Sequence, residues 1–221
     1  MVSGRPIEDQ SISVWQDNMS LDSVKLLGIS GSPRLGATDF AVRAALDYAK
    51  GKYQVETEYF TVHGKKIGFC IHCDHCVRKR EGCIQKDDVR DLYVKMEWAN
   101  AWLLGSPVYQ GQICGQLKAV LDRCRALVAR NPKVFENKVG AGLAVGGDRN
   151  GGQEPAIQTM IDFYLISEMI PVGGGSFGAN LGGAVWSRDK GADGAADDAE
   201  GIKAVRRTVD RLIGVASLIH K

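Results

Sequence analysis

The chain has 221 residues, of which 44% are hydrophobic and 24% are charged, which is enough to bury one core and short for two domains. Its 28 basic and 26 acidic side chains give a net charge of +2, and no block of like charge points to nucleic acid or to a membrane surface as partner. No apolar run approaches the roughly 20 residues of a membrane helix, and residues 1–23 lack the apolar stretch of a secretory signal. We therefore expect a cytoplasmic protein.

The first predicted elements are a strand, a helix and a second strand. Residues 24–30 are apolar and β-branched and stop at a Gly/Ser/Pro turn, as a buried parallel strand does. Thr38 and Asp39 then offer N-cap side chains to a helix that continues to about residues 50–51. Residues 54–62 alternate polar with apolar side chains, which predicts the second strand.

The rest of the chain continues this alternation after an irregular, cysteine-rich segment at 63–86. The apolar spacing predicts helices at 87–96, 115–129, 153–169 and 200–219 and strands at 99–105, 138–146 and 170–172. The stretch 173–199 is rich in Gly, Ala and Asp, and we interpret it as a long loop. Residues 1–23 fit no element and are interpreted as an N-terminal arm.

Alternation of strands and helices requires crossover connections, which produce a parallel sheet with helices on both faces. Five strands in this arrangement predict a doubly wound, flavodoxin-like α/β fold with strand order 2-1-3-4-5. We expect one domain over residues 24–221 that includes the cysteine-rich loop at 63–86.

Ligands of such sheets bind beyond the carboxyl ends of the strands. The loop after the first strand, residues 30–38, combines glycines, hydroxyls and Arg34 and leads into a helix N-terminus, which is typical of a phosphate site. It has neither the lysine of a G-x-x-x-x-G-K-[ST] loop nor a G-x-G-x-x-G pattern. A single terminal phosphate therefore suits it better than a triphosphate or a dinucleotide.

Two further loops are predicted at the same edge of the sheet. Residues 106–111 offer Tyr109 as a flat partner for a ring, and residues 146–153 offer backbone amides to the polar edge of a heterocycle. With Leu117-Lys118, Asp122-Arg123 and Gln153-Glu154, these loops resemble the NADPH-dependent FMN reductase family of flavodoxin-like proteins, over roughly residues 24–175.

The resemblance implies that the protein binds FMN. It implies phosphate contacts at Ser30, Ser32, Arg34, Ala37 and Thr38. It implies isoalloxazine contacts at Pro107, Val108, Tyr109, Gln110, Gly111, Gly147, Asp148, Arg149, Gly151 and Gly152. Ala37 occupies a position where relatives often carry a polar residue such as Asn, so we expect one side-chain contact fewer.

Four of the six cysteines form the pattern C-x2-C-x2-C-x6-C at Cys70, Cys73, Cys76 and Cys83. This spacing lets one chain wrap around an inorganic cluster held by four thiolates. A structural zinc is the alternative, although zinc sites usually present two separate C-x2-C pairs. Cys114 and Cys124 are predicted to pack in the core.

This motif, between the second strand and Asp87-Asp88, resembles the iron-sulfur flavoproteins. The resemblance implies a 4Fe-4S cluster, a homodimer or homotetramer, and electrons that arrive from a ferredoxin-like donor. Because the motif follows the second strand, we expect it at the sheet edge that carries the flavin loops. Cluster and flavin could then exchange electrons within one subunit or across an interface.

The leading hypothesis is thus a redox protein that moves electrons between an iron-sulfur cluster and FMN. One alternative is an NAD(P)H-dependent FMN or quinone reductase whose cysteines bind zinc or only brace a loop. Another is a non-enzymatic flavin-binding sensor that uses residues 1–23 to interact. The apolar side chains of that arm, Ile7, Ile12, Val14 and Trp15, favour an assembly over a monomer.

Overall fold

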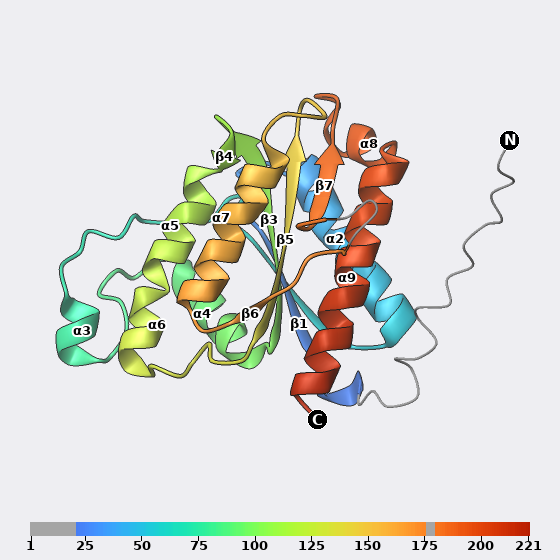
Figure 1. The fold of residues 1–221 in the computed structure, drawn as a ribbon. Helices are drawn as coiled ribbons and strands as arrows, with labels where there is room; N and C mark the ends of the chain where they lie inside the picture. Colours follow the sequence, from blue (N-terminus) through green and yellow to red (C-terminus); the bar gives the residue numbers. More distant parts are fainter. Residues whose placement is uncertain (1–20, 176–179) are drawn as a thin grey trace, which may run out of the picture.

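The computed structural model describes residues 21–175 and 180–221, and a central sheet carries helices on both faces (Figure 1). The strands are β1 (Lys25–Ser30), β2 (Glu56–Thr61), β3 (Ala101–Tyr109), β4 (Gln112–Ile113), β5 (Val139–Gly146), β6 (Ile170–Pro171) and β7 (Gly183–Trp186). The helices are η1 (Leu21–Ser23), α2 (Ala37–Tyr53), α3 (His75–Lys79), α4 (Val89–Trp98), α5 (Gly115–Arg123), α6 (Arg125–Arg130), α7 (Gln153–Ile166), α8 (Gly191–Ala196) and α9 (Ala199–Ile219).

The main strands run parallel in the order β2-β1-β3-β5-β6. This confirms the predicted flavodoxin-like order 2-1-3-4-5. β6 pairs with β5 only at Val139 and Gly140, whereas β7 pairs with β5 from Leu143 to Gly146. Two short strands therefore share one edge of β5. The carboxyl ends of β1, β3 and β5 meet at one edge of the sheet, where the predicted ligand loops begin.

Each face of the sheet has its own apolar core. Trp102 and Phe135 meet edge to face, with ring centroids 5.0 Å apart, in the core under α4, α5 and α7. Val42 and Leu212 belong to the core under α2 and α9. Every residue of β5 is buried, and its small side chains let helices approach closely: a Cβ at Gly140 would lie 2.6 Å from the Tyr164 ring.

The prediction of a long loop at 173–199 is wrong, because the described part of this stretch contains β7 and α8. Because this stretch consists largely of small residues, it lacks the apolar periodicity from which the other elements were predicted. Gly183 illustrates the reason, since a Cβ there would lie 2.8 Å from the Val205 side chain of α9. Close packing against α9 thus selects glycine where a strand would ordinarily carry a large apolar side chain.

Several predicted boundaries also differ from those observed. The helix expected at 115–129 is divided into α5 and α6 at Cys124. The helix expected to reach residue 169 ends at Ile166, because Glu168 adopts a left-handed backbone with φ of 59°. Residues 1–20 of the predicted arm lie outside the described residues. In the described ranges, no helix is long and apolar enough to cross a membrane.

Candidate functional site

A pocket of about 380 Å³ lies at the carboxyl ends of β1, β3 and β5. We call it the sheet-edge pocket. It is lined by Ser32, Arg34, Leu35, Gly36, Ala37, Thr38, Pro107, Val108, Tyr109, Val145, Gly147, Ser187, Asp189 and Gly191. All three predicted loops thus contribute to one cavity. The predicted site residues that do not line it are Ser30, Gln110, Gly111, Asp148, Arg149, Gly151 and Gly152.

The first turn of α2 faces this pocket without a side-chain cap. The prediction that Thr38 and Asp39 cap the helix is wrong, because both lie inside its first turn. Asp39 accepts hydrogen bonds from Arg43 (2.9 Å) and from the Tyr59 hydroxyl. Backbone N–H groups at such a helix start attract anions through hydrogen bonding and the helix dipole. The turn therefore suits a phosphate group.

The loop before α2 is braced by its own side chains. The Ser32 hydroxyl donates to the Arg34 carbonyl (2.8 Å) and accepts from the Arg34 N–H (3.1 Å). The exposed Arg34 side chain supplies a positive charge at the pocket. Ser30 is fully buried, and its hydroxyl has no hydrogen-bond partner among the described residues. Ser32 thus shapes the loop, while the N–H groups and Arg34 remain available to an anion.

The second predicted loop is the end of a strand and a hairpin turn. β3 continues to Tyr109 and pairs antiparallel with β4. Gln110 and Gly111 form the turn, with φ of 51° and 76°, as in the tight turns that join antiparallel strands. Gly152 has φ of 102°, and a Cβ there would lie 2.8 Å from the Cα of Gly111. The second and third loops therefore touch through glycine backbone.

Arg149 points to the start of α9. It forms an ion pair with Asp198 at 2.9 Å and stacks on Trp186, 4.7 Å from the ring centroid. The Trp186 indole N–H donates to the Gly147 carbonyl (2.7 Å). These contacts hold the third loop in position. Arg149 thus supports the loop, whereas it was expected from the sequence to contact the flavin.

Sequence reasoning missed the pocket residues Ser187 and Asp189, because they lie in the segment expected to be a plain loop. Asp189 and the preceding Arg188 have left-handed backbones, with φ of 54° and 52°. A Cβ at Gly147 would lie 2.4 Å from the Asp189 carboxylate. Strained non-glycine backbone beside a cavity is common at functional sites.

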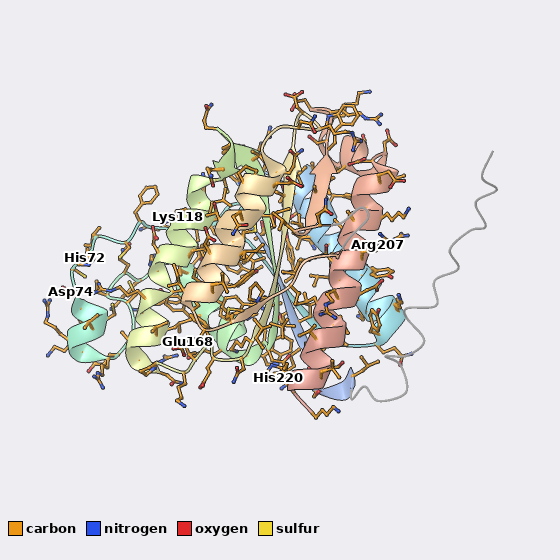
Figure 2. The ribbon with its side chains drawn as sticks, in the orientation of Figure 1. His72, Asp74, Lys118, Glu168, Arg207 and His220 are labelled. Carbon is orange, nitrogen blue, oxygen red and sulfur yellow. The ribbon has the colours of Figure 1, made fainter. Side chains whose placement is uncertain are left out.

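The cysteine loop projects beyond the sheet and contains α3, with His72 and Asp74 at its outer part (Figure 2). Its four thiols are all free. Cys70 and Cys73 are exposed, whereas Cys76 and Cys83 pack partly against the core. The donor set therefore fits an iron-sulfur cluster chemically. Within the described ranges, no three His, Cys, Asp or Glu side chains lie close enough together to hold a metal ion.

The cysteine loop begins near the sheet-edge pocket, but its cysteines lie farther from the pocket. Its first residue, His63, contacts the loop after β1, whereas Gly68 contacts Arg123 at the far end of α5 and Asp74 pairs with Arg125 of α6 at 2.7 Å. The nine residues of α5 span about 13 Å. The expectation that the motif lies at the flavin edge is therefore wrong for the cysteines themselves.

Comparison with solved structures supports the fold class. The NAD(P)H:acceptor oxidoreductase flavoenzyme of Paracoccus denitrificans matches with a TM-score of 0.64 at 17% identity, over 90% of this chain and all of the other. A flavodoxin-like, WrbA-like protein from Agrobacterium tumefaciens matches with a TM-score of 0.62 at 16% identity, also over 90% of this chain and all of the other. The fold is that of the flavodoxin-like proteins.

Sequence comparison then gives the family. Residues 24–183 match the family described as NADPH-dependent FMN reductase. An iron-sulfur flavoprotein from Methanocaldococcus jannaschii is 56% identical, over 87% of this chain and 96% of the relative. Another from Archaeoglobus fulgidus is 50% identical, over 84% and 94%. The chain belongs to the iron-sulfur flavoproteins of the NADPH-dependent FMN reductase family, a family of flavin-dependent oxidoreductases.

Proposed function

We propose that the protein binds FMN in the sheet-edge pocket and a 4Fe-4S cluster in the cysteine loop, and that it accepts electrons from a reduced ferredoxin-like protein. The observation that carries this proposal is the presence, in one chain, of four free thiols in a single loop and of a pocket whose helix N-terminus is uncapped. When bound, a cluster exchanges single electrons and a flavin one or two.

The pocket favours FMN over a larger flavin nucleotide. The uncapped first turn of α2 and Arg34 together offer donors and charge for one phosphate group. Pro107, Val108 and Tyr109 supply an apolar and aromatic wall for a ring system. Without the lysine of a triphosphate-binding loop, the chain has no counterpart for further phosphates in this turn.

The surface of the cysteine loop favours an acidic protein as electron donor. Residues 63–86 carry six of the 28 basic side chains and two of the 26 acidic ones, so the excess positive charge of the chain is concentrated here. Phe69 and Ile71 are exposed to 71% and 70%. Exposed apolar side chains in a segment rich in basic residues suit a partner of opposite charge, because complementary charge speeds encounter.

The path of the cysteine loop favours assembly into a homodimer or homotetramer. The cysteines lie along α5 and α6, away from the pocket of their own subunit. A second copy that docks on this side would bring a flavin pocket toward them. Transfer across an interface is therefore the route that we propose.

The test is an iron, zinc, sulfide and flavin analysis of protein prepared without oxygen, followed by turnover with reduced ferredoxin or with NADPH. We expect iron and sulfide in equal amounts, FMN as the flavin, and flavin reduction by ferredoxin. Zinc in place of iron, with NADPH as the only effective donor, would support the reductase alternative instead. Light scattering of the full chain tests the assembly, which a monomer would contradict.

A further inference from the structure

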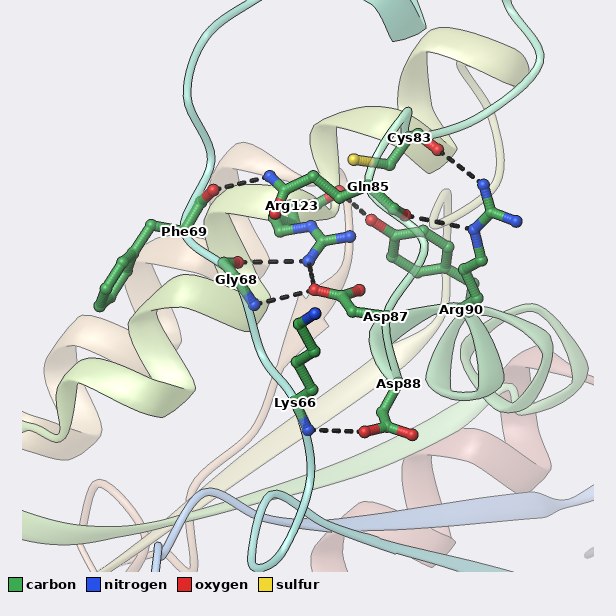
Figure 3. A network of polar contacts seen from close by, with 10 residues as sticks. Lys66, Gly68, Phe69, Cys83, Gln85, Asp87, Asp88, Arg90 and Arg123 are labelled. Atoms are coloured by element: carbon green, nitrogen blue, oxygen red, sulfur yellow. Dashed lines mark hydrogen bonds and ion pairs between the residues drawn. The ribbon is translucent and has the colours of Figure 1, made fainter.

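Asp87 and Arg123, which stand 36 residues apart in the sequence, form an ion pair beneath the cysteine loop (Figure 3). Arg123 Nη1 donates to the Asp87 carboxylate and to the Gly68 carbonyl at 3.2 Å. The same Asp87 oxygen accepts from the Gly68 N–H at 2.8 Å. The side chains of Arg123 and Asp87 are only 1% and 4% exposed, so this is a buried ion pair.

The contacts join the two ends of the cysteine loop, which we call the loop base (residues 66–69 and 83–88). Gly68 comes two residues before Cys70, and Asp87 comes four residues after Cys83. Asp88 accepts from the Lys66 N–H at 2.6 Å. Asp87 and Asp88 therefore hold the loop: Asp88 is the N-cap residue of α4, which begins at Val89, but its side chain makes no capping hydrogen bond.

Additional hydrogen bonds close the loop base from the cysteine side. The Gln85 side chain donates to the Phe69 carbonyl at 2.7 Å, and Arg90 donates to the Cys83 carbonyl at 3.2 Å. A Cβ at Gly68 would lie 2.1 Å from the Gln85 side-chain oxygen, so the Gln85 side chain packs directly on the Gly68 backbone. These hydrogen bonds thus fix the backbone next to Cys70 and at Cys83, the first and last cysteines of the motif.

Arg123 retains unused hydrogen-bonding capacity in this buried place. Its Nε and Nη2 have no hydrogen-bond partner among the described residues. Burial lowers the pKa of Arg123, but the hydrogen bond to Asp87 and the neighbouring Tyr93 and Cys83 groups more than reverse this effect, so the guanidinium stays charged. A buried charge with unused donors is costly unless something accepts them.

The cysteine thiolates next to the loop base are suitable hydrogen-bond acceptors for the unpaired N–H groups of Arg123. Figure 3 shows Arg123 between Asp87 and the segment that carries Cys83 and Gln85. Cys76 and Cys83 are the two thiols that pack against the core. A cluster held by four thiolates is anionic, and nearby charge and hydrogen bonds to its sulfurs set its reduction potential.

We infer that Arg123 is a positioning residue of the iron-sulfur site: through Asp87 and Gly68 it fixes the two ends of the cysteine loop, and it places a buried positive charge and two nitrogens without a partner beside the segment that carries Cys83. The inference rests on the proposed cluster.

The test compares three variants with the wild type. They are Arg123→Gln, Arg123→Lys, and a double variant that carries both Asp87→Asn and Arg123→Gln. Arg130→Gln is the matched control, because Arg130 lies on the neighbouring α6 and also forms an ion pair, but an exposed one with Glu97 of α4 and not with the cysteine loop. For each protein, prepared without oxygen, we would measure iron and FMN per chain, the melting temperature, and the midpoint potential of the cluster.

We expect Arg123→Gln to lose more than half of its iron while it keeps its FMN, and the remaining cluster to have a more negative potential, because the reduced form loses a neighbouring positive charge. Arg123→Lys should recover part of the iron. The double variant removes the unpaired Asp87 charge, so it should melt near the wild-type temperature and still lose iron, with a smaller shift of potential because a negative charge is lost as well. Arg130→Gln should match the wild type in all measurements.

Wild-type iron content in the double variant would overturn the inference alone, as would parallel loss of iron and FMN in every Arg123 variant, which indicates general unfolding. Absence of iron from the unaltered protein would overturn the proposed function and this inference with it.

Discussion

The Nδ1 atom of His63 lies 2.9 Å from the carbonyl oxygen of Pro33. The first residue of the cysteine loop is thereby linked to the loop that approaches the proposed flavin phosphate. Apart from this contact, different interactions stabilise the two sites. Ser32 braces the phosphate loop, and the Arg123–Asp87 ion pair braces the cysteine loop. Substitutions in one site are therefore expected to leave the other largely intact.

Arg34→Ala is expected to weaken FMN binding about tenfold or more, because a hydrogen bond to a charged group contributes about 1.5–3 kcal/mol. Fluorescence titration of the flavin-free protein measures the affinity. Lys50→Ala is the control, since Lys50 lies in the last turn of the same helix, away from the pocket. Equal affinities of the two variants would remove Arg34 from the phosphate site.

Cys73→Ala is expected to abolish the broad brown absorption of an iron-sulfur cluster while FMN stays bound, because Cys73 contributes no atom to the pocket. Absorption spectra and iron analysis provide the measurement. Cys124→Ala serves as control: Cys124 is buried in the core, where its thiol lies 3.8 Å from the Met96 sulfur. Loss of iron from the control and not from Cys73→Ala would contradict the ligand assignment.

Asp189→Asn is expected to make the midpoint potential of the bound flavin more positive, because the carboxylate in the pocket wall repels the negative charge that reduction adds. A spectroscopic redox titration measures the shift. Asp193→Asn on α8 is a control with the same chemical change outside the pocket. A flavin potential that is equal in both variants would show that Asp189 does not face the flavin.

Charge reversal of Arg78, Lys79 and Arg80 to Glu is expected to slow ferredoxin-driven flavin reduction by at least tenfold at low salt, because all three are exposed on the cysteine loop. The difference should shrink as salt is added. Stopped-flow kinetics at several ionic strengths measure it. Reversal of Lys50, Lys203 and Arg206, which lie on α2 and α9, is the control of equal charge change, and equal slowing there would contradict docking at the loop.

Lys138→Met is expected to change how stability depends on pH. The Lys138 ammonium donates to the carbonyls of Met96, Glu97 and Ala99 at the end of α4, and burial lowers its pKa to about 8. Between pH 8 and about pH 10.4 the unfolded chain retains a proton that the folded chain has lost. The free energy of unfolding of the wild type should therefore rise with pH relative to the variant, by at most about 1.4 kcal/mol per pH unit.

Urea unfolding of both proteins at pH 8 and pH 10 measures this difference. A constant difference between wild type and variant over that interval would contradict the lowered pKa.

The sequence was sufficient for the order of the strands, because buried parallel strands such as β1 and β5 are short apolar runs that end in glycine-rich turns. The sequence did not predict β7, because the small residues of this strand pack against α9 and show no apolar alternation. Local patterns report which side of an element is buried, and they carry little information where glycine replaces the buried side chain.

For the site, the sequence identified the loops and the thiols better than the function of individual side chains. Asp39 and Asp87 both resemble helix caps in sequence, yet Asp39 bonds Tyr59 and Asp87 bonds Arg123. Both partners are distant in the chain, so the competition between a local cap and a long-range contact is decided by tertiary packing. Asp189 was missed for a related reason, because the fold of β7 brings it to the pocket.

The loop base has a consequence for how such proteins can diversify. The chain leaves the sheet after β2 and returns at α4, and the exit and return points are bonded to each other through Lys66 and Asp88. A segment whose ends already meet can be lengthened, shortened or exchanged without displacing the strands on either side. An evolving lineage could therefore alter this one insertion while the sheet-edge pocket is inherited unchanged.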